Sequence, residues 1–131
     1  MARRKTKTLT ELELEIMQAL WDRDTATVEE LAAIFADEGK PLAPSSFRTM
    51  LGILKDKGYV SRRRAGRGFA YQARVPADKA RKSMVSDLIR RVFDGSAIDL
   101  VAALVKDGMV SADDLTKARA LIRQTEKGEK R

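Results

Sequence analysis

The chain contains neither cysteine nor histidine. The lack of cysteine excludes a disulfide framework and a thiol nucleophile. Without imidazole as well, the usual zinc, copper and haem sites are excluded, as are Ser-His and Cys-His catalytic pairs. A Gly-rich phosphate loop is also missing, so we expect no cofactor and no enzymatic activity.

No apolar run approaches the roughly 20 residues that are needed to span a bilayer. The basic start Arg3, Arg4, Lys5 leads into a charged amphipathic stretch rather than into the apolar core of a signal peptide. We therefore expect a globular, cytoplasmic protein without a membrane partner. With Lys7, these basic residues form either an arm that adds phosphate contacts or a segment without a role in binding.

Charge is sorted along the chain. The stretch from Ala43 to Val75 holds eight basic residues and one acidic residue, a net charge of +7 that equals the net charge of the whole chain. The stretch before it, from Thr8 to Leu42, holds two basic and nine acidic residues, a net charge of −7. A region that collects cations in this way is typical of a surface that binds nucleic acid.

The first part of the chain has the periodicity of three helices. Capping-box patterns at Thr10 and at Thr27 predict the starts of the first two. Pro44 suits the first turn of the third, because its missing amide hydrogen is not needed there. Helical spacing then predicts an inward face on this third helix made of Phe47, Met50, Leu51 and Leu54.

After Gly58 the spacing becomes alternating. Residues 59–64 and 69–75 predict two strands around a turn at residues 65–68, with Ala70 on the outward face. Three helices followed by a hairpin are the order of a winged helix-turn-helix, and we assign residues 1–75 to such a DNA-binding domain.

Residues 76–131 predict three more amphipathic helices, which are too few to enclose a core alone. Because twofold homo-oligomers are the commonest assemblies, we expect this region to form a homodimer. The fold class is thus mainly α with a small β-hairpin, a winged helix-turn-helix followed by a three-helix dimerisation region. The tail, residues 126–131, has no apolar residue and is expected to fray. The residues expected in the dimer seam are Met84, Val85, Leu88, Ile89, Val92, Leu104, Leu121 and Ile122.

Four polar residues are expected to face outward from the start of the third helix, namely Ser45, Ser46, Arg48 and Thr49. On a recognition helix, such side chains reach base edges and phosphates in the major groove, and arginine bonds guanine in a bidentate fork. In the alternative interpretation, the two serines only cap the helix and Arg48 is a solvated surface residue.

Four arginines gather at the hairpin and its turn, namely Arg62, Arg63, Arg64 and Arg67. A wing in this position lies over the phosphate backbone or enters a minor groove. No carboxylate is near them in the sequence, so a role in surface ion pairs explains them poorly. We expect them to contact double-stranded DNA.

Several stretches, taken together, resemble the BlaI/MecI penicillinase-repressor family: LTELELEIM at 9–17, Leu20-Trp21, SFRTML at 46–51, Leu54, KGYV at 57–60 and FAY at 69–71. The resemblance runs from Leu9 to Ile122. It implies a bacterial transcriptional repressor that binds a palindromic operator as a homodimer and controls β-lactam-resistance or related genes. In that family, a regulatory protease cleaves the C-terminal dimerisation helices after a membrane sensor detects β-lactam.

The chain departs from the family pattern at two places. Ile53 stands where many members have arginine, which removes one expected phosphate or base contact. Ala103-Leu104 stands at the family-type cleavage position, where the best-known members have Asn-Phe. The copper-responsive branch uses a C-terminal cysteine cluster, which this chain lacks.

Two other interpretations of the basic hairpin remain open. A sequence-nonspecific architectural or RNA-binding protein would bind random duplex or RNA as tightly as any operator. An adaptor that uses a winged helix to bind proteins would have little affinity for DNA.

Overall fold

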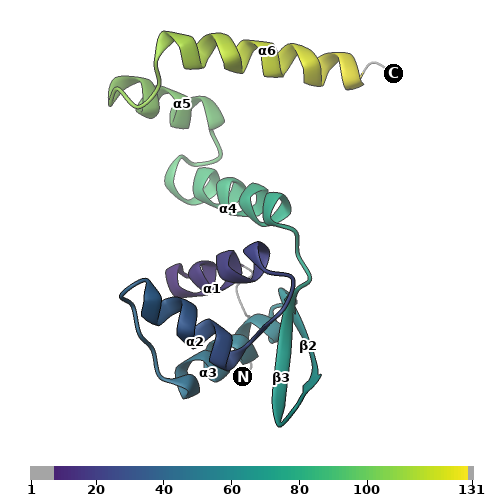
Figure 1. Cartoon of the computed structure of the whole chain (residues 1–131). Helices are drawn as coiled ribbons and strands as arrows, with labels where there is room; N and C mark the ends of the chain where they lie inside the picture. The colour runs from purple at the N-terminus through teal and green to yellow at the C-terminus, as the bar shows by residue number, and fades with distance from the viewer. Residues whose placement is uncertain (1–7, 130–131) are drawn as a thin grey trace, which may run out of the picture. The chain divides into compact units, whose positions relative to one another are not determined.

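The computed structural model describes residues 8–129 (Figure 1), so the basic arm with Arg3, Arg4, Lys5 and Lys7 lies outside the described residues. The chain divides into two compact units, with the boundary between Ser86 and Asp87. The elements are α1 (Glu11–Asp22), β1 (Ala26–Thr27), α2 (Val28–Asp37), α3 (Pro44–Asp56), β2 (Val60–Ala65), β3 (Gly68–Ala73), α4 (Ala77–Val92), α5 (Ala97–Lys106) and α6 (Ala112–Glu129).

Both predicted capping boxes are present. At the start of α1, the Thr10 amide donates to Glu13 Oε1 over 2.8 Å, and the Glu13 amide donates to Thr10 Oγ1 over 3.3 Å. At α2 the Thr27 amide donates to Glu30 Oε1 over 2.9 Å. This last bond is the main cause that holds the pKa of Glu30 below its ordinary value. Local side chains therefore determine where both helices begin.

A third strand joins the predicted hairpin. β1 pairs antiparallel with β3, with Ala26 opposite Tyr71 and Thr27 opposite Ala70, and the order in the sheet is β1-β3-β2. Two residues are too few to show an alternating pattern. Ala70 was predicted on the outward face, where an exposed side chain is expected. Its small side chain is only 6% exposed, because Ala70 lies in the central strand between Thr27 and Arg63.

The hairpin ends in a turn shorter than predicted. The pairing of β2 with β3 continues to the ends of both strands, so the loop consists of Gly66 and Arg67 rather than of residues 65–68. Gly66 has a φ of +62°. A positive φ at the first residue of a two-residue loop is typical of the type II′ turn, whose twist matches that of the flanking strands. Arg67 thus lies at the tip of the wing.

The core of the first unit lies between α1, α2, α3 and the sheet. On the third helix, Phe47, Leu51 and Leu54 are fully buried, as predicted, and Met50 is half-buried. Phe47 meets Phe35 of α2 edge to face, with 5.0 Å between the ring centroids. These contacts fix the rotation of α3 about its own axis, and hence the face that it turns outward.

The first turns of α4 also belong to this unit. Ala80 is buried, and Met84 is partly buried against the same core. Just before the helix, Trp21 Nε1 of α1 donates to the Val75 carbonyl over 2.8 Å. The compact unit continues to Ser86. The assignment of DNA binding to residues 1–75 and of dimerisation to residues 76–131 stays a prediction.

The second unit, residues 87–129, has a different character. From Leu88 to Lys127, no described side chain is buried. α5 and α6 are separated by Gly108, whose φ is +73°. α6 extends to Glu129, which agrees with the good helix propensity of Glu and Lys, and the fraying expected after residue 125 stays a prediction. Within residues 8–129, none of the helices is both long and apolar enough to cross a membrane.

Candidate nucleic-acid interface

α3 presents a polar surface opposite its buried face. Ser45, Arg48 and Thr49 are exposed and Ser46 is half-buried. The residue that caps the helix is Ala43, and no side chain bonds its first-turn amides. The serines therefore do not act as caps, and their contact with nucleic acid stays a prediction. Within the described chain, no hydrogen bond or ion pair occupies the guanidinium of Arg48.

A buried ion pair attaches the other end of α3 to α1. Lys57 Nζ lies 2.8 Å from Glu13 Oε1, with side-chain exposures of 6% and 2%. Lys57 also donates to the Thr8 carbonyl over 3.0 Å. Burial by itself would raise the pKa of Glu13, but the hydrogen bonds from Lys57 and Thr10 and the charge of Lys57 outweigh it and hold that pKa below its ordinary value. The glutamate thus stays ionised and paired.

This ion pair lowers the number of basic residues that contribute positive charge to the surface. Lys57 was counted among the cations of the basic stretch, yet it is buried and neutralised by Glu13. Its role is to hold α3 in place rather than to attract a phosphate. The lysine and glutamate are 44 residues apart in the chain, so only the folded structure brings them together.

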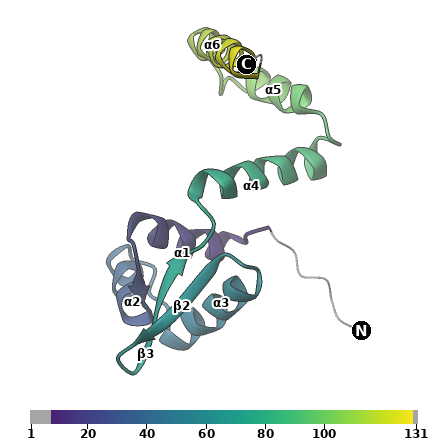
Figure 2. The same cartoon turned by 90° about the vertical axis from the view of Figure 1, so that its right-hand side faces the viewer.

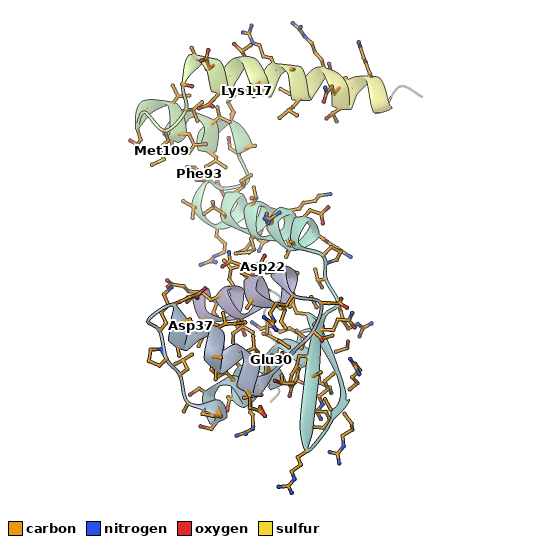
Figure 3. The ribbon with its side chains drawn as sticks, viewed as in Figure 1. Asp22, Glu30, Asp37, Phe93, Met109 and Lys117 are labelled. Atoms are coloured by element: carbon orange, nitrogen blue, oxygen red, sulfur yellow. The ribbon has the colours of Figure 1, made fainter. Side chains whose placement is uncertain are left out.

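The arginines of the wing are exposed, but they do not form one cluster. Arg62 lies opposite Tyr71 and Arg64 opposite Phe69, so both share one face of the sheet. Arg63 lies on the other face. In Figure 3, nitrogen-tipped side chains extend from the outer side of the hairpin and from its tip. The wing therefore offers positive charge on two faces and at its tip.

Phe69 orients two of these side chains. The Arg62 guanidinium carbon lies 4.0 Å from the centroid of the Phe69 ring, and that of Arg64 lies 5.6 Å away. Both distances are within the range of cation–π attraction. The prediction of the hairpin from the sequence did not include this contact. The alternation of Arg62 and Arg64 on β2, paired with an aromatic residue on β3, is the signal that could have revealed it.

α3 and the wing lie side by side. Figures 1 and 2 both show α3 beside the β2–β3 hairpin, and both elements belong to the first unit. In the described part of the chain, no ion pair joins Arg48 or the wing arginines to a carboxylate. A helix with exposed polar groups next to a wing whose guanidinium groups have no carboxylate partner among the described residues can contact base edges and phosphates together.

A groove elsewhere on this unit carries charges of both signs. This α1–α2 groove, of about 870 Å³, is lined by α1, α2 and the start of α4, and its lining includes the carboxylates of Glu11, Glu15, Asp22 and Glu38 and the cations of Arg23, Lys40 and Arg81. Lys40 pairs with Glu15, so the groove has no excess of positive charge that would attract nucleic acid. Among the residues that the structure describes, no three acidic side chains are grouped so as to hold a metal ion.

The predicted seam residues are spread over α4, α5 and α6. Val85, Leu88, Val92, Leu121 and Ile122 are exposed. The others, Met84, Ile89 and Leu104, are half-buried, and Met84 packs against the core of the first unit. Most of the predicted seam is thus apolar surface that the folded chain leaves uncovered.

Known proteins resemble this chain over most of its length. The model of the penicillinase repressor family matches residues 9–124. The methicillin resistance regulatory protein MecI of Staphylococcus aureus (strain N315) is 23% identical over 118 residues, which cover 90% of this chain and 95% of that protein. An uncharacterized 16.5 kDa protein in the ptsI 3′ region of Latilactobacillus sakei is 24% identical over 117 residues, which cover 89% of this chain and 80% of that protein.

A solved structure agrees on the fold. The DNA-binding domain of the repressor BlaI, determined in solution, matches with a TM-score of 0.50 and 23% identity, covering 59% of this chain and 93% of that domain. The winged helix-turn-helix expected from the sequence is therefore confirmed. Because the family model covers most of the chain, this protein belongs to the penicillinase repressor family, whose members are DNA-binding transcriptional repressors and not enzymes.

Proposed function

We propose that two copies of this chain bind a palindromic operator and repress transcription by blocking the promoter. The observation that carries the proposal is the exposed polar face of α3, a helix that lies beside the arginine-bearing wing (Figures 1 and 2). Each copy places α3 in a major groove, where Arg48 and its neighbours read base edges. The wings lie on the flanking phosphate backbone and supply affinity that is independent of sequence.

The apolar surface of the C-terminal helices supports a homodimer. Val92 is 62% exposed, Leu121 63% and Ile122 58%. Single apolar side chains are common on surfaces, but repeated exposure along three successive helices marks a surface that is covered by a partner. A second copy of the chain supplies an identical apolar surface and, through twofold symmetry, two reading helices for a palindrome.

The similarity to MecI leads us to propose β-lactam-resistance or related genes as the targets. Release from the operator by a regulatory protease would require cleavage at the family-type position, Ala103-Leu104. Both residues lie inside α5 and are half-buried, so this helix must open before a protease can bind it as an extended strand. Immunoblots of cells treated with a β-lactam test this: a fragment that ends at Ala103 supports cleavage, and an intact chain during derepression contradicts it.

Selection of duplexes from a random library at physiological salt tests operator recognition. We expect a palindrome to be enriched, and Arg48→Ala to weaken binding to it by about 1–3 kcal/mol while relaxing the preference at one position in each half-site. An equal loss on every duplex would contradict a base contact by Arg48.

Replacement of Arg62, Arg63 and Arg64 by Gln should weaken binding to all duplexes. The slope of log K against log salt should flatten by about 0.9 for each lost phosphate contact. Lys40→Ala is the matched control, because this exposed lysine pairs with Glu15 on the acidic side of the unit. An unchanged slope in the triple variant would remove the wing from the interface.

A further inference from the structure

Ile53 is out of place for a domain with a well-covered core. In residues 8–76, it is the only large apolar side chain that the structure describes as exposed, with 38% of its surface accessible. It lies on α3 outside the buried stripe of Phe47, Leu51 and Leu54. The exposed part of this isoleucine adds nothing to the packing of the helix, and apolar surface left in water is unfavourable.

The residue before it is equally unexplained by the fold. Gly52 lies inside α3, where glycine destabilises a helix relative to alanine. A Cβ at this position would meet no atom within 4 Å, and the backbone has no positive φ that would require glycine. Nothing inside the folded chain therefore needs a bare backbone here.

Both residues adjoin the polar surface of α3. Neighbours on a helix are three or four residues apart, so Gly52 lies next to Arg48 and Thr49, and Ile53 lies next to Thr49. Together they form one continuous patch, with a cation at one side, a gap in the middle and an apolar side chain at the other side. In the major groove, the apolar group that a base edge offers is the C5-methyl of thymine.

We propose that Ile53 contacts the C5-methyl group of one thymine in each half-site, and that the gap at Gly52 lets the base edges approach the helix backbone. The inference rests on the proposed function, since it assigns sequence preference within the same interface. It predicts an operator that prefers thymine at one position of each half-site, in addition to the position contacted by Arg48.

The test exchanges thymine for uracil, which lacks only this methyl group. Each thymine of the selected operator is replaced in turn, symmetrically in both half-sites, and binding of the full chain is measured. Removing one methyl group from a buried contact corresponds to about 0.8 kcal/mol, or about fourfold in affinity for each half-site. We expect one position to show this loss with the native protein.

The variant Ile53→Ala, measured on the thymine and the uracil operators, completes a double-mutant cycle. The variant should bind the thymine operator about as weakly as the native protein binds the uracil operator, and it should not distinguish the two. Ile34→Ala, a half-buried isoleucine of α2 that lines the α1–α2 groove, should keep the full preference for thymine. A thymine preference that survives in Ile53→Ala, or operators in which every exchange is neutral, would overturn the inference and leave the proposed function intact.

Gly52→Ala tests the gap. The added methyl group should raise the melting temperature of the protein and weaken operator binding at the same time. Unchanged or tighter binding would show that the base edges do not approach the backbone there. If the native protein enriched no sequence from the library, the proposed function would fail and this inference with it.

Discussion

The two compact units carry amphipathic helices of the same kind but cover them to different extents. In the first unit, α1, α2 and α3 bury their apolar stripes against one another and against the sheet, so that Ile16, Leu31 and Leu51 have no accessible surface. In the second unit, Ile98 is 70% and Leu121 63% exposed. The comparison teaches that an apolar stripe on a helix predicts only a surface to be covered: in the first unit the same chain covers it, and in the second we propose that a second copy does.

The largest effect is expected from Lys57→Met in the first unit. This change leaves Glu13 buried without its partner, and removal of one member of a buried ion pair costs about 3–5 kcal/mol. The free energy of unfolding can be measured in urea by the fluorescence of Trp21, the single tryptophan of the chain.

Two variants control this measurement. Lys55→Met changes an exposed lysine of the same helix and should cost little. The double variant Glu13→Gln, Lys57→Met should recover part of the loss, because no unpaired charge remains. A cost below about 1 kcal/mol for Lys57→Met would show that water compensates the carboxylate and that the pair does not lock α3.

The second unit should respond to Leu88→Asp through assembly rather than through folding. Burying a new carboxylate in an apolar seam should weaken self-association by at least about 2 kcal/mol. Sedimentation should then show monomers at concentrations where the native chain is dimeric, and operator binding should weaken. Ser83→Asp, an exposed position away from this stripe, is the control. A Leu88→Asp variant that still sediments as a dimer would move the seam elsewhere.

Acid should lower the stability of the first unit through Glu13. The pKa of Glu13 in the folded state lies below its ordinary value of 4.5, so the pair stabilises the first unit fully above about pH 4.5. This stabilisation is lost as the pH falls through the depressed pKa. Urea unfolding followed at Trp21 should therefore show a drop in stability below about pH 4.5 that is smaller in Glu13→Gln. Equal acid sensitivity of the two proteins would contradict a stabilising role for the charge.

The smallest expected effect concerns the wing. Phe69→Leu removes the ring under Arg62 but no charge, so DNA binding should weaken by about 0.5–1 kcal/mol while the salt slope stays the same. Phe69→Tyr keeps a ring and should bind as the native protein does. A changed slope in Phe69→Leu would mean that the ring affects the number of phosphate contacts rather than the orientation of the guanidinium.

Local features of the fold could be predicted from the sequence. Thr10 and Thr27 start their helices through bonds to residues three positions later, and the inward stripe of α3 follows from helical spacing. These signals depend on residues within one or two helical turns of each other, so the sequence contains all the groups that determine them. The winged helix-turn-helix order followed from them.

Features that depend on distant pairs could not be predicted. β1 exists only because Ala26 and Thr27 meet β3, more than 40 residues further along the chain. The burial of Lys57 depends on Glu13, and the orientation of Arg62 depends on the strand opposite it. In each case the local sequence is compatible with more than one environment, and contacts between distant residues determine which one the segment adopts.

The sorted charge of the first unit has a consequence for how the protein reaches DNA. Residues 8–42 and 43–75 carry −7 and +7, and the buried pair of Glu13 and Lys57 removes one charge of each sign from the surface. The remaining charges of the two stretches cancel in total and, where they lie apart in the unit, act as a dipole. A dipole in the field of a polyanion experiences mainly a torque, which turns the unit so that its positive side leads. Added salt screens that field, and more of the encounters should then begin with the negative side of the unit toward the duplex and end without binding.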